Sequence, residues 1–209
     1  MMELMQRGGP VMWVQLGLAL GVATIFLERL FHLHRAHIRV DDFLQGVFNI
    51  LRKGNIVEAA TICEETPGPV ARVVQAAVLK AEGEPTEICQ AVEDAGLEEM
   101  PRLQARLGLL ATLGQIAPYM GLLGTVLGMI EVLLRLQERA PLVHAGDLAG
   151  GLWEALISTA AGLSIAAVAY AAYNLLVGRV EAILLDMERA ATEAVSFLQQ
   201  LKRRPGTAR

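Results

Sequence analysis

The chain has 209 residues, of which 54% are hydrophobic and only 19% charged, and its mean hydropathy is +0.43. Water-soluble domains of this length are less apolar, so the composition excludes an ordinary soluble protein. The formal net charge of −4, without any interleaving of basic and aromatic residues, gives no indication of nucleic-acid binding.

The first predicted element is an apolar helix near the N-terminus. Residues 8–27 contain no charged side chain. This stretch is longer than the apolar region of a secretory signal peptide, and no cleavage site of small residues precedes Glu28. Trp13 and Phe31 flank it, as aromatic residues do at membrane surfaces. We therefore expect residues 1–30 to hold a retained transmembrane helix.

Residues 31–106 are predicted to form a helical domain with turns at glycine and proline. Asp41 and Asp42 are suited to cap a helix from Phe43 onward, because a carboxylate accepts hydrogen bonds from free backbone N–H groups. Further helices are expected over residues 56–63, 70–81 and from 86, with breaks at 54–55, 67–69 and 83–85. Pro101 is expected in the first turn of a helix that continues through residues 102–108 into the next span.

Two later stretches, residues 107–130 and 155–178, each have 24 residues without a charge. A helix of that length is about 36 Å long, which exceeds the roughly 30 Å of a bilayer core. We expect a two-helix transmembrane region at 107–178, with spans at about 107–133 and 151–178. Residues 179–209 are expected to be a C-terminal amphipathic helix and tail, with the helix over 181–201 and its end at Pro205–Gly206. No segment alternates as a strand does, so the predicted fold is an all-α membrane protein.

The distribution of Lys and Arg predicts the orientation of the chain. Fifteen of the eighteen lie in residues 28–106 and 178–209, while only three lie in residues 1–7 and 131–154. Since Lys and Arg are more frequent in cytoplasmic loops, we expect residues 31–106 and the C-terminus in the cytoplasm. The N-terminus then lies on the opposite side, together with the connection between the second and third spans.

Small residues form a stripe along each of the last two spans. Helices gain no hydrophobic energy by associating in lipid, and small residues let their backbones approach closely. One threonine lies in each stripe, Thr125 and Thr159. The threonines either bond the carbonyl four residues earlier in a tight bundle, or act in a polar route through the membrane. The packing residues of the two stripes are Ala117, Gly121, Gly124, Gly128, Ala155, Gly162 and Ala166.

Two carboxylates flank the spans, Glu131 after the second and Glu154 before the third. A carboxylate near membrane depth is costly and suggests an ion route or a buried partner. The alternative is that both lie among lipid headgroups, with Glu154 favouring a helix N-terminus. Both interpretations of Glu154 stay open at this point.

The remaining chemistry-bearing residues give no catalytic pattern. His32, His34 and His37 are close in sequence, but no carboxylate or thiol joins them, so we expect an interfacial cluster and no metal site. Cys63 and Cys89 lack metal-ligand spacing and are expected to be packed, reduced thiols. There is no nucleophile–base pair and no phosphate-binding loop, which indicates neither an enzyme nor a cofactor.

Two motifs resemble a known family. Residues 117–130, APYMGLLGTVLGMI, closely resemble the second-span motif of the ExbB/TolQ branch of the MotA/TolQ/ExbB proton channel family. Residues 154–163, EALISTAAGL, resemble its third-span motif, and Tyr173–Asn174 match the end of that motif. Residues 51–81 are similar too. The resemblance extends from the first span over most of the chain.

This resemblance implies a function and partners. Family members assemble as an oligomeric ring, commonly a pentamer, around the single spans of an ExbD- or TolR-like partner in the bacterial inner membrane. Proton flow through the assembly energises a TonB- or TolA-like protein that acts on the outer membrane. The protonatable aspartate belongs to the partner. By resemblance, Thr125 and Thr159 face that aspartate, and Glu154 lies at the mouth of the pore.

Two residues depart from the family pattern. Val168 stands where a proline is usual, and Glu131 stands where a neutral polar residue is common. The MotA branch fits less well, because its members have four spans and three are predicted here. The same stripes would also suit a different class of protein, a non-conducting helical scaffold that assembles partner subunits.

Overall fold

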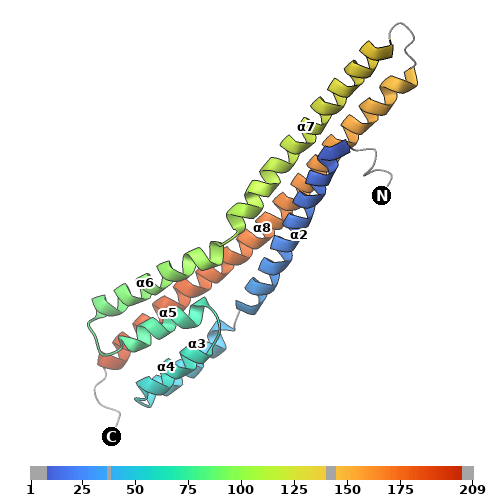
Figure 1. Ribbon diagram of the computed structural model, residues 1–209. Helices are drawn as coiled ribbons and strands as arrows, with labels where there is room; N and C mark the ends of the chain where they lie inside the picture. The colour runs from blue at the N-terminus through green and yellow to red at the C-terminus, as the bar shows by residue number, and fades with distance from the viewer. Residues whose placement is uncertain (1–8, 37–38, 140–144, 204–209) are drawn as a thin grey trace. The chain divides into compact units, whose positions relative to one another are not determined.

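The computed structural model describes residues 9–36, 39–139 and 145–203, and every regular element among them is a helix (Figure 1). The described helices are α2 (Gly9–Ala36), α3 (Val40–Arg52), α4 (Ile56–Glu65), α5 (Pro69–Leu79), α6 (Pro85–Gln104), α7 (Leu107–Arg139) and α8 (Ala145–Arg203). The predicted all-α class is confirmed for these residues. The predicted helix end at Pro205–Gly206 lies outside them.

Three helical segments are long and apolar enough to cross a membrane: Pro10–Leu33, a second within Pro85–Glu138, which covers all but the last residue of α7, and a third within Ala149–Arg203, which belongs to α8. Their length and composition agree with the three predicted spans. The third span and the predicted C-terminal helix form one continuous helix of 59 residues. Gly178 does not end this helix, because its backbone stays helical.

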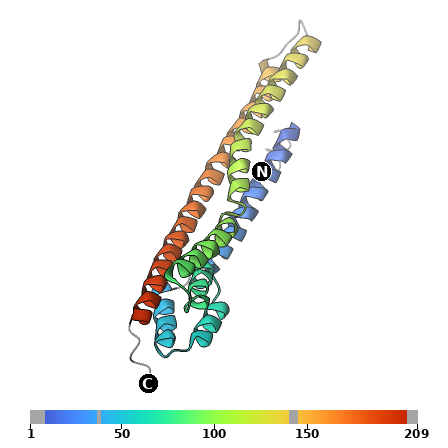
Figure 2. The ribbon, with the colours of Figure 1, turned by 90° about the vertical axis from the view of Figure 1, so that its left-hand side faces the viewer.

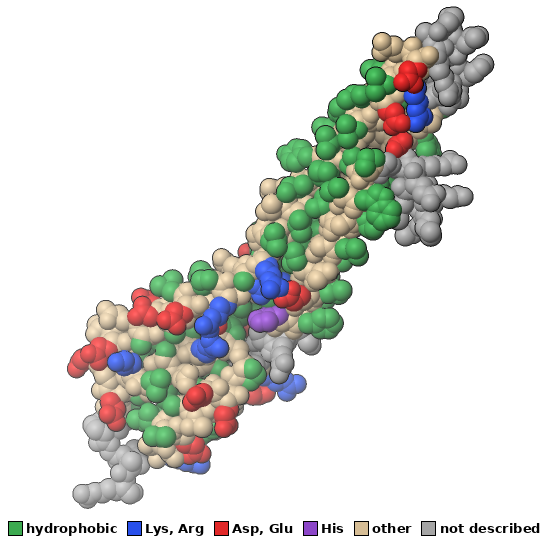
Figure 3. Space-filling model, viewed as in Figure 1, with side chains coloured by type: hydrophobic (Ala, Val, Ile, Leu, Met, Phe, Trp, Pro, Cys, Tyr) green, Lys and Arg blue, Asp and Glu red, His purple; other side chains and the backbone are tan. Residues whose placement is uncertain are grey.

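The chain divides into two compact units. The membrane unit comprises the described residues within 1–28 and 106–176, and the charged unit comprises those within 29–105 and 177–209. In the membrane unit, α2, α7 and the first part of α8 lie side by side (Figures 1 and 2). On the face shown in Figure 3, hydrophobic side chains cover most of this unit, and charged side chains gather where α7 ends.

The charged unit has a core of large apolar side chains. Helix α3 packs against α4, α4 against α5, and α5 against α6. Leu44, Val47, Val74 and Ile88 are at most 2% exposed, so water is excluded from this core. The ring of Phe48 stacks on Phe197 of α8, with 4.2 Å between the ring centroids. The amphipathic C-terminal part of α8 therefore completes the core of the charged unit.

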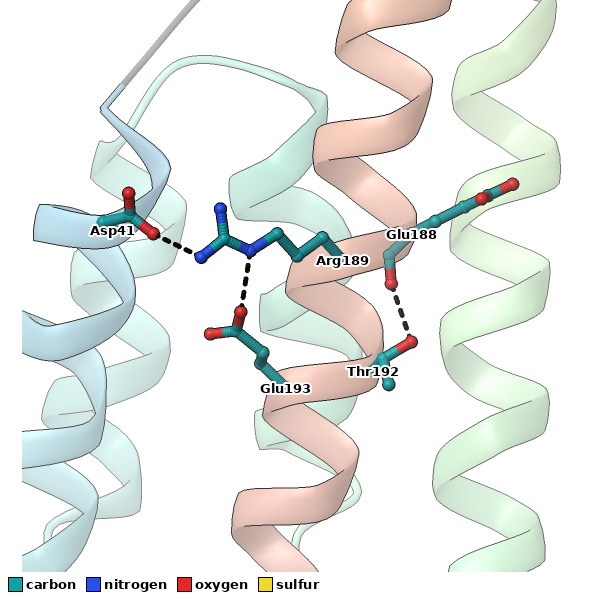
Figure 4. Close-up of polar contacts among 5 residues, drawn as sticks. All are labelled: Asp41, Glu188, Arg189, Thr192 and Glu193. Carbon is teal, nitrogen blue, oxygen red and sulfur yellow. Dashed lines mark hydrogen bonds and ion pairs between the residues drawn. The ribbon is translucent and has the colours of Figure 1, made fainter.

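Ion pairs join the helices of the charged unit at its surface. Arg189 of α8 donates from Nη2 to Asp41 Oδ1 of α3 and from Nε to Glu193 Oε1, both at 2.9 Å (Figure 4). One helical turn from Arg189, Thr192 donates to the carbonyl of Glu188 at 2.9 Å. Because Arg189 and its partners are largely exposed, these pairs fix geometry more than they stabilise the unit.

A more buried ion cluster joins α5 to α6. The side chain of Glu99 is 10% exposed, and its Oε1 accepts from Arg72 and Arg102, each at 2.6 Å. Two guanidinium groups thus share one carboxylate oxygen, which compensates the cost of burying its charge.

The predicted cap at Asp41 and Asp42 is wrong in position. Helix α3 begins at Val40, and its N-cap residue is Arg39, which makes no side-chain capping bond. Both aspartates lie inside the first turn, where a negative charge still interacts favourably with the N-terminal end of the helix dipole. The other predicted breaks are confirmed, since Asn55 caps α4 through a bond from the Glu58 N–H and Gly68 has φ 125° before α5.

The expected continuous helix through residues 102–108 is also wrong. Helix α6 ends at Gln104, Ala105 is extended with ψ 140°, and Arg106 has φ 62° before α7 begins. Pro101 lies in the last turn of α6 and not in a first turn. The buried Arg29 donates from Nη2 to the carbonyls of Arg102 and Ala105, so a long-range contact caps the end of α6.

The two cysteines have different surroundings. Cys63 is buried in the charged unit, where burial raises the pKa of its thiol to about 11. Cys89 is exposed, so the expectation that it is packed is wrong. Position 89 lies near the start of α6 on a face that no other described helix covers.

Candidate functional site: a hydroxyl pair between two spans

The small residues of α7 and α8 contact each other inside the membrane unit. Gly162 is the tightest point, because a Cβ atom placed on it would lie 2.6 Å from the carbonyl oxygen of Ala117 and 2.9 Å from Cα of Gly121. A Cβ placed on Gly128 would similarly lie 3.0 Å from that of Ala155. Any larger side chain at these positions would push the helices apart, so the glycines set the distance between them.

Of the seven residues predicted to pack the stripes, all but Ala166 take part in this contact. Six are buried, and Ala166 is half-buried. Ser158 of α8 also belongs to the stripe, although the sequence prediction did not include it. It is 1% exposed and occupies the space left by the missing side chain of Gly124. Whether any of these residues lines a pore in an assembly stays a prediction.

The two predicted threonines meet at the edge of this contact. The hydroxyl oxygens of Thr125 and Thr159 are in hydrogen-bond contact across the two helices. The carbonyl oxygen of Gly121 lies 3.1 Å from the Thr125 hydroxyl and 3.2 Å from that of Thr159. Both side chains are half-buried, so one side of the pair is open at the surface of the chain.

The hydroxyl pair differs from the other hydroxyl groups in the same helices. Thr112 of α7 and Ser164 of α8 are exposed, and each donates at 2.8 Å to the carbonyl four residues earlier in its own helix. Thr125 can do the same toward Gly121, but Thr159 reaches the carbonyl of the other helix. The interpretation in which each threonine bonds only its own helix therefore fails for Thr159.

The two carboxylates lie toward the end of α7. Glu131 pairs with Arg135 at 2.5 Å, and both side chains are about half exposed. Glu154 is half-buried near the start of α8. No hydrogen bond joins it to Thr125 or Thr159, which agrees with its place roughly 140° around the helix from Thr159. A role for Glu154 at a pore mouth stays a prediction.

A residue of α2 also reaches this region, which the sequence prediction missed. Gln15 is 1% exposed, and its Nε2 donates to the carbonyl of Ser158 at 2.9 Å and to the Ser158 hydroxyl at 3.2 Å. A glutamine inside an apolar span is itself a signal, because polar side chains in lipid require partners. The other polar side chain in that stretch, Thr24, is exposed and donates to the carbonyl of Leu20 in its own helix.

The structure describes only part of the histidine cluster. His32 is exposed, the side chain of His34 is not described, and His37 lies outside the described residues. Among the described residues, no three His, Cys, Asp or Glu side chains come together as metal ligands would.

A family model for the MotA/TolQ/ExbB proton channel family matches residues 65–189, which is more than half of the chain. The match takes in both threonines, Glu154 and all seven packing residues of the stripes. It does not include α2.

Individual relatives carry related descriptions. The chain is 25% identical to a biopolymer transport protein ExbB homolog of Methanothermobacter thermautotrophicus, over 86% of this chain and 64% of the relative. It is 30% identical to a biopolymer transport protein ExbB-like 1 of Synechocystis sp., over 82% of this chain and 68% of the relative. The Tol-Pal system protein TolQ of Haemophilus influenzae is 38% identical over 49% of this chain and 44% of that protein. The chain, with three apolar helices long enough to cross a membrane, belongs to the MotA/TolQ/ExbB proton channel family.

Proposed function

We propose that this protein is the channel-forming subunit of an inner-membrane energy transducer. With a single-span partner of the ExbD or TolR type, it conducts protons and couples the proton-motive force to a TonB- or TolA-like protein acting on the outer membrane. The family match and relatives described as ExbB and TolQ support this proposal. The N-terminus lies in the periplasm and the C-terminus in the cytoplasm, as the distribution of Lys and Arg favours.

The hydroxyl pair of Thr125 and Thr159 is the observation that carries the proposal. Each hydroxyl has one hydrogen. One hydrogen is used in the bond between the two threonines, and the other is donated to the carbonyl of Gly121. The pair therefore offers oxygen lone pairs on its open side and has no donor hydrogen left. A protonated carboxyl of a partner helix, or a water molecule, can donate to these lone pairs.

The surroundings of the pair suit a partner helix that carries a titratable group. No charged residue occurs between positions 107 and 130 or between 155 and 178. A carboxyl group at this depth is costly to ionise, so it tends to stay protonated unless water or a charge reaches it. The pair would hydrogen-bond the protonated form, and release of the proton would weaken that contact.

The other predicted parts of the assembly follow from the same proposal. Several copies of the chain, five by resemblance, surround the partner spans in a ring. Glu154 stands at the mouth of the route, and the packing residues that meet between α7 and α8 hold these helices at the distance that the hydroxyl pair needs.

Replacing the hydroxyls tests the proposal. Thr125→Val and Thr159→Val keep the shape of the side chain and remove the hydroxyl. Removing an acceptor leaves the buried carboxyl or water hydrogen without a partner, which costs about 1–3 kcal/mol, so each variant should lower proton uptake about five- to hundredfold. Uptake is measured in proteoliposomes that hold the chain with its partner, under an imposed proton gradient, and is normalised to the amount of assembled complex.

Thr112→Val is the matched control, because Thr112 is exposed in α7 and bonds only its own helix. Its uptake should equal that of the wild type. If both valine variants at the pair assemble and conduct as the wild type does, the threonines only pack. If the wild type itself assembles with its partner and shows no gradient-dependent uptake, the protein is a non-conducting scaffold.

A further inference from the structure

The side-chain amide of Gln15 in α2 makes two hydrogen bonds to α8. Both hydrogens of its Nε2 point to one residue of α8, the first to the carbonyl of Ser158 at 2.9 Å and the second to the hydroxyl at 3.2 Å. The orientation of the amide is unambiguous, because a carbonyl oxygen only accepts and must face the NH₂ group. Gln15 thus binds the backbone of α8 as well as a side chain.

The opposite end of the amide has no partner. Gln15 Oε1 is buried, and no donor among the described residues reaches it. An unsatisfied acceptor is costly in an apolar environment, whereas an apolar pair of the same size in place of Gln15 and Ser158 would be close to neutral. The amide therefore contributes little to stability, and its bond to α8 requires another explanation.

The bond acts at the residue next to the hydroxyl pair. Ser158 lies in the space that Gly124 leaves open, and Thr159 follows it in α8. Successive residues of a helix are rotated by about 100°. A bond to the backbone carbonyl of Ser158 fixes both the rotation and the height of α8 at this level. A rotated α8 would carry the Thr159 hydroxyl away from Thr125 and from the carbonyl of Gly121.

We propose that Gln15 is a positioning residue for the hydroxyl pair: α2 sets the rotation of α8 so that Thr159 meets Thr125. The consequence for proton flow rests on the proposed function, but the consequence for geometry does not. The first span thereby takes part in the site through its bond to Ser158, the residue before Thr159.

A cross-linking experiment tests the geometry. Thr125→Cys and Thr159→Cys are combined in a Cys89→Ser background, and the disulfide between positions 125 and 159 is followed by mass spectrometry under mild oxidation. Gln15→Met, which has nearly the same length without the amide, should slow formation of the disulfide about tenfold. Thr24→Val is the matched control in α2, because Thr24 is exposed and bonds its own helix. It should leave the rate unchanged.

The Gln15→Glu variant distinguishes loss of the hydrogen bond to Ser158 from a folding defect. When protonated, its carboxyl group can still donate to the carbonyl of Ser158, whereas the ionised form can only repel that oxygen. The rate of disulfide formation in each variant is divided by the rate in the chain with Gln15 at the same pH. For Gln15→Glu this ratio should be close to one at low pH and should fall to that of Gln15→Met at high pH. A purely packing role predicts no rescue at low pH, where Gln15→Glu would then cross-link at the rate of Gln15→Met.

Proton uptake by Gln15→Met, with both threonines intact, completes the test and should fall about tenfold. If Gln15→Met leaves the cross-linking rate and uptake unchanged while Thr125→Val lowers uptake as expected, the positioning role is wrong and the proposed function holds. If Gln15→Met slows cross-linking but Thr125→Val conducts normally, Gln15 positions the pair and the proposed proton route is wrong.

Discussion

The membrane unit and the charged unit place their large and small side chains in opposite ways. In the membrane unit, glycines and alanines lie between α7 and α8, while Leu122, Val126 and other large apolar residues are exposed. In the charged unit, large residues such as Leu44 and Ile88 fill the core, and most charged side chains lie at the surface. Both units consist of helices, so secondary structure does not explain the difference.

The surrounding medium explains it. In water, a large apolar side chain gains free energy when it is buried, at about 25 cal/mol per Å². In lipid it gains nothing by leaving the hydrocarbon, and helices associate through close backbone contact and hydrogen bonds. The hydroxyl pair and the Gln15–Ser158 bond lie in such close helix contacts of the membrane unit, where a polar group has few other partners.

The largest expected effect is the difference in stability between replacing a buried leucine of the charged unit and replacing an exposed leucine of the membrane unit. Leu44→Ala should lower the free energy of unfolding by about 2–5 kcal/mol, because Leu44 is 2% exposed in the core of the charged unit. Leu122→Ala in α7, where the side chain is 59% exposed, should change it by less than about 0.5 kcal/mol. Thermal unfolding of the purified protein measures both. An equal loss in the two variants would show that another chain covers the outer face of α7.

A smaller effect is expected from adding a methyl group to a glycine of the membrane unit. Gly162→Ala should destabilise the α7–α8 contact by about 1–3 kcal/mol, because the new Cβ meets backbone atoms of α7 that cannot move aside. Gly108→Ala is the matched control, since nothing lies within 4 Å of a Cβ there. Alanine favours helix, so this control should be neutral or slightly stabilising. Similar melting temperatures for the two variants would contradict the close contact.

The smallest effect concerns Cys63 in the charged unit. Burial raises the pKa of its thiol from 9.0 to about 11, so the folded state keeps the proton longer than the unfolded state. Stability is unaffected below pH 9 and should fall as the pH rises from 9 toward 11. Cys63→Ala should remove this part of the pH dependence, while Cys89→Ser should leave it. Denaturant unfolding at several pH values measures it, and identical profiles for all three proteins would refute the burial argument.

Much of the membrane unit could be predicted from local patterns. Three uncharged stretches specify helices that can span a bilayer, and small residues every three or four positions specify a stripe on one face. Thr125 and Thr159 each belong to such a stripe, so their proximity followed once α7 and α8 packed together. These predictions needed only the helical period and the chemistry of lipid.

Other features depend on contacts that no local pattern contains. The residues around Ala105 and Arg106 favour helix, but Arg29, more than 70 positions earlier, donates to the carbonyls that end α6. Cys89 has neighbours typical of a packed helix, yet the face on which it lies is exposed. Helix α3 begins at Val40, one residue before its aspartates, and the side chain of Val40 is buried, which a local capping pattern does not indicate.

By itself, therefore, the sequence determined the class of protein, the three spans and the faces on which their small residues lie, since these depend on composition and a fixed period of 3.6 residues. Only the tertiary structure decided that the Thr159 hydroxyl bonds both the Thr125 hydroxyl and the Gly121 carbonyl of α7. It also decided that Gln15 of α2 donates to the backbone carbonyl of Ser158, next to Thr159. The physical reason is that a hydrogen bond between helices depends on their rotation and height, and these are set by the sum of contacts along all three helices.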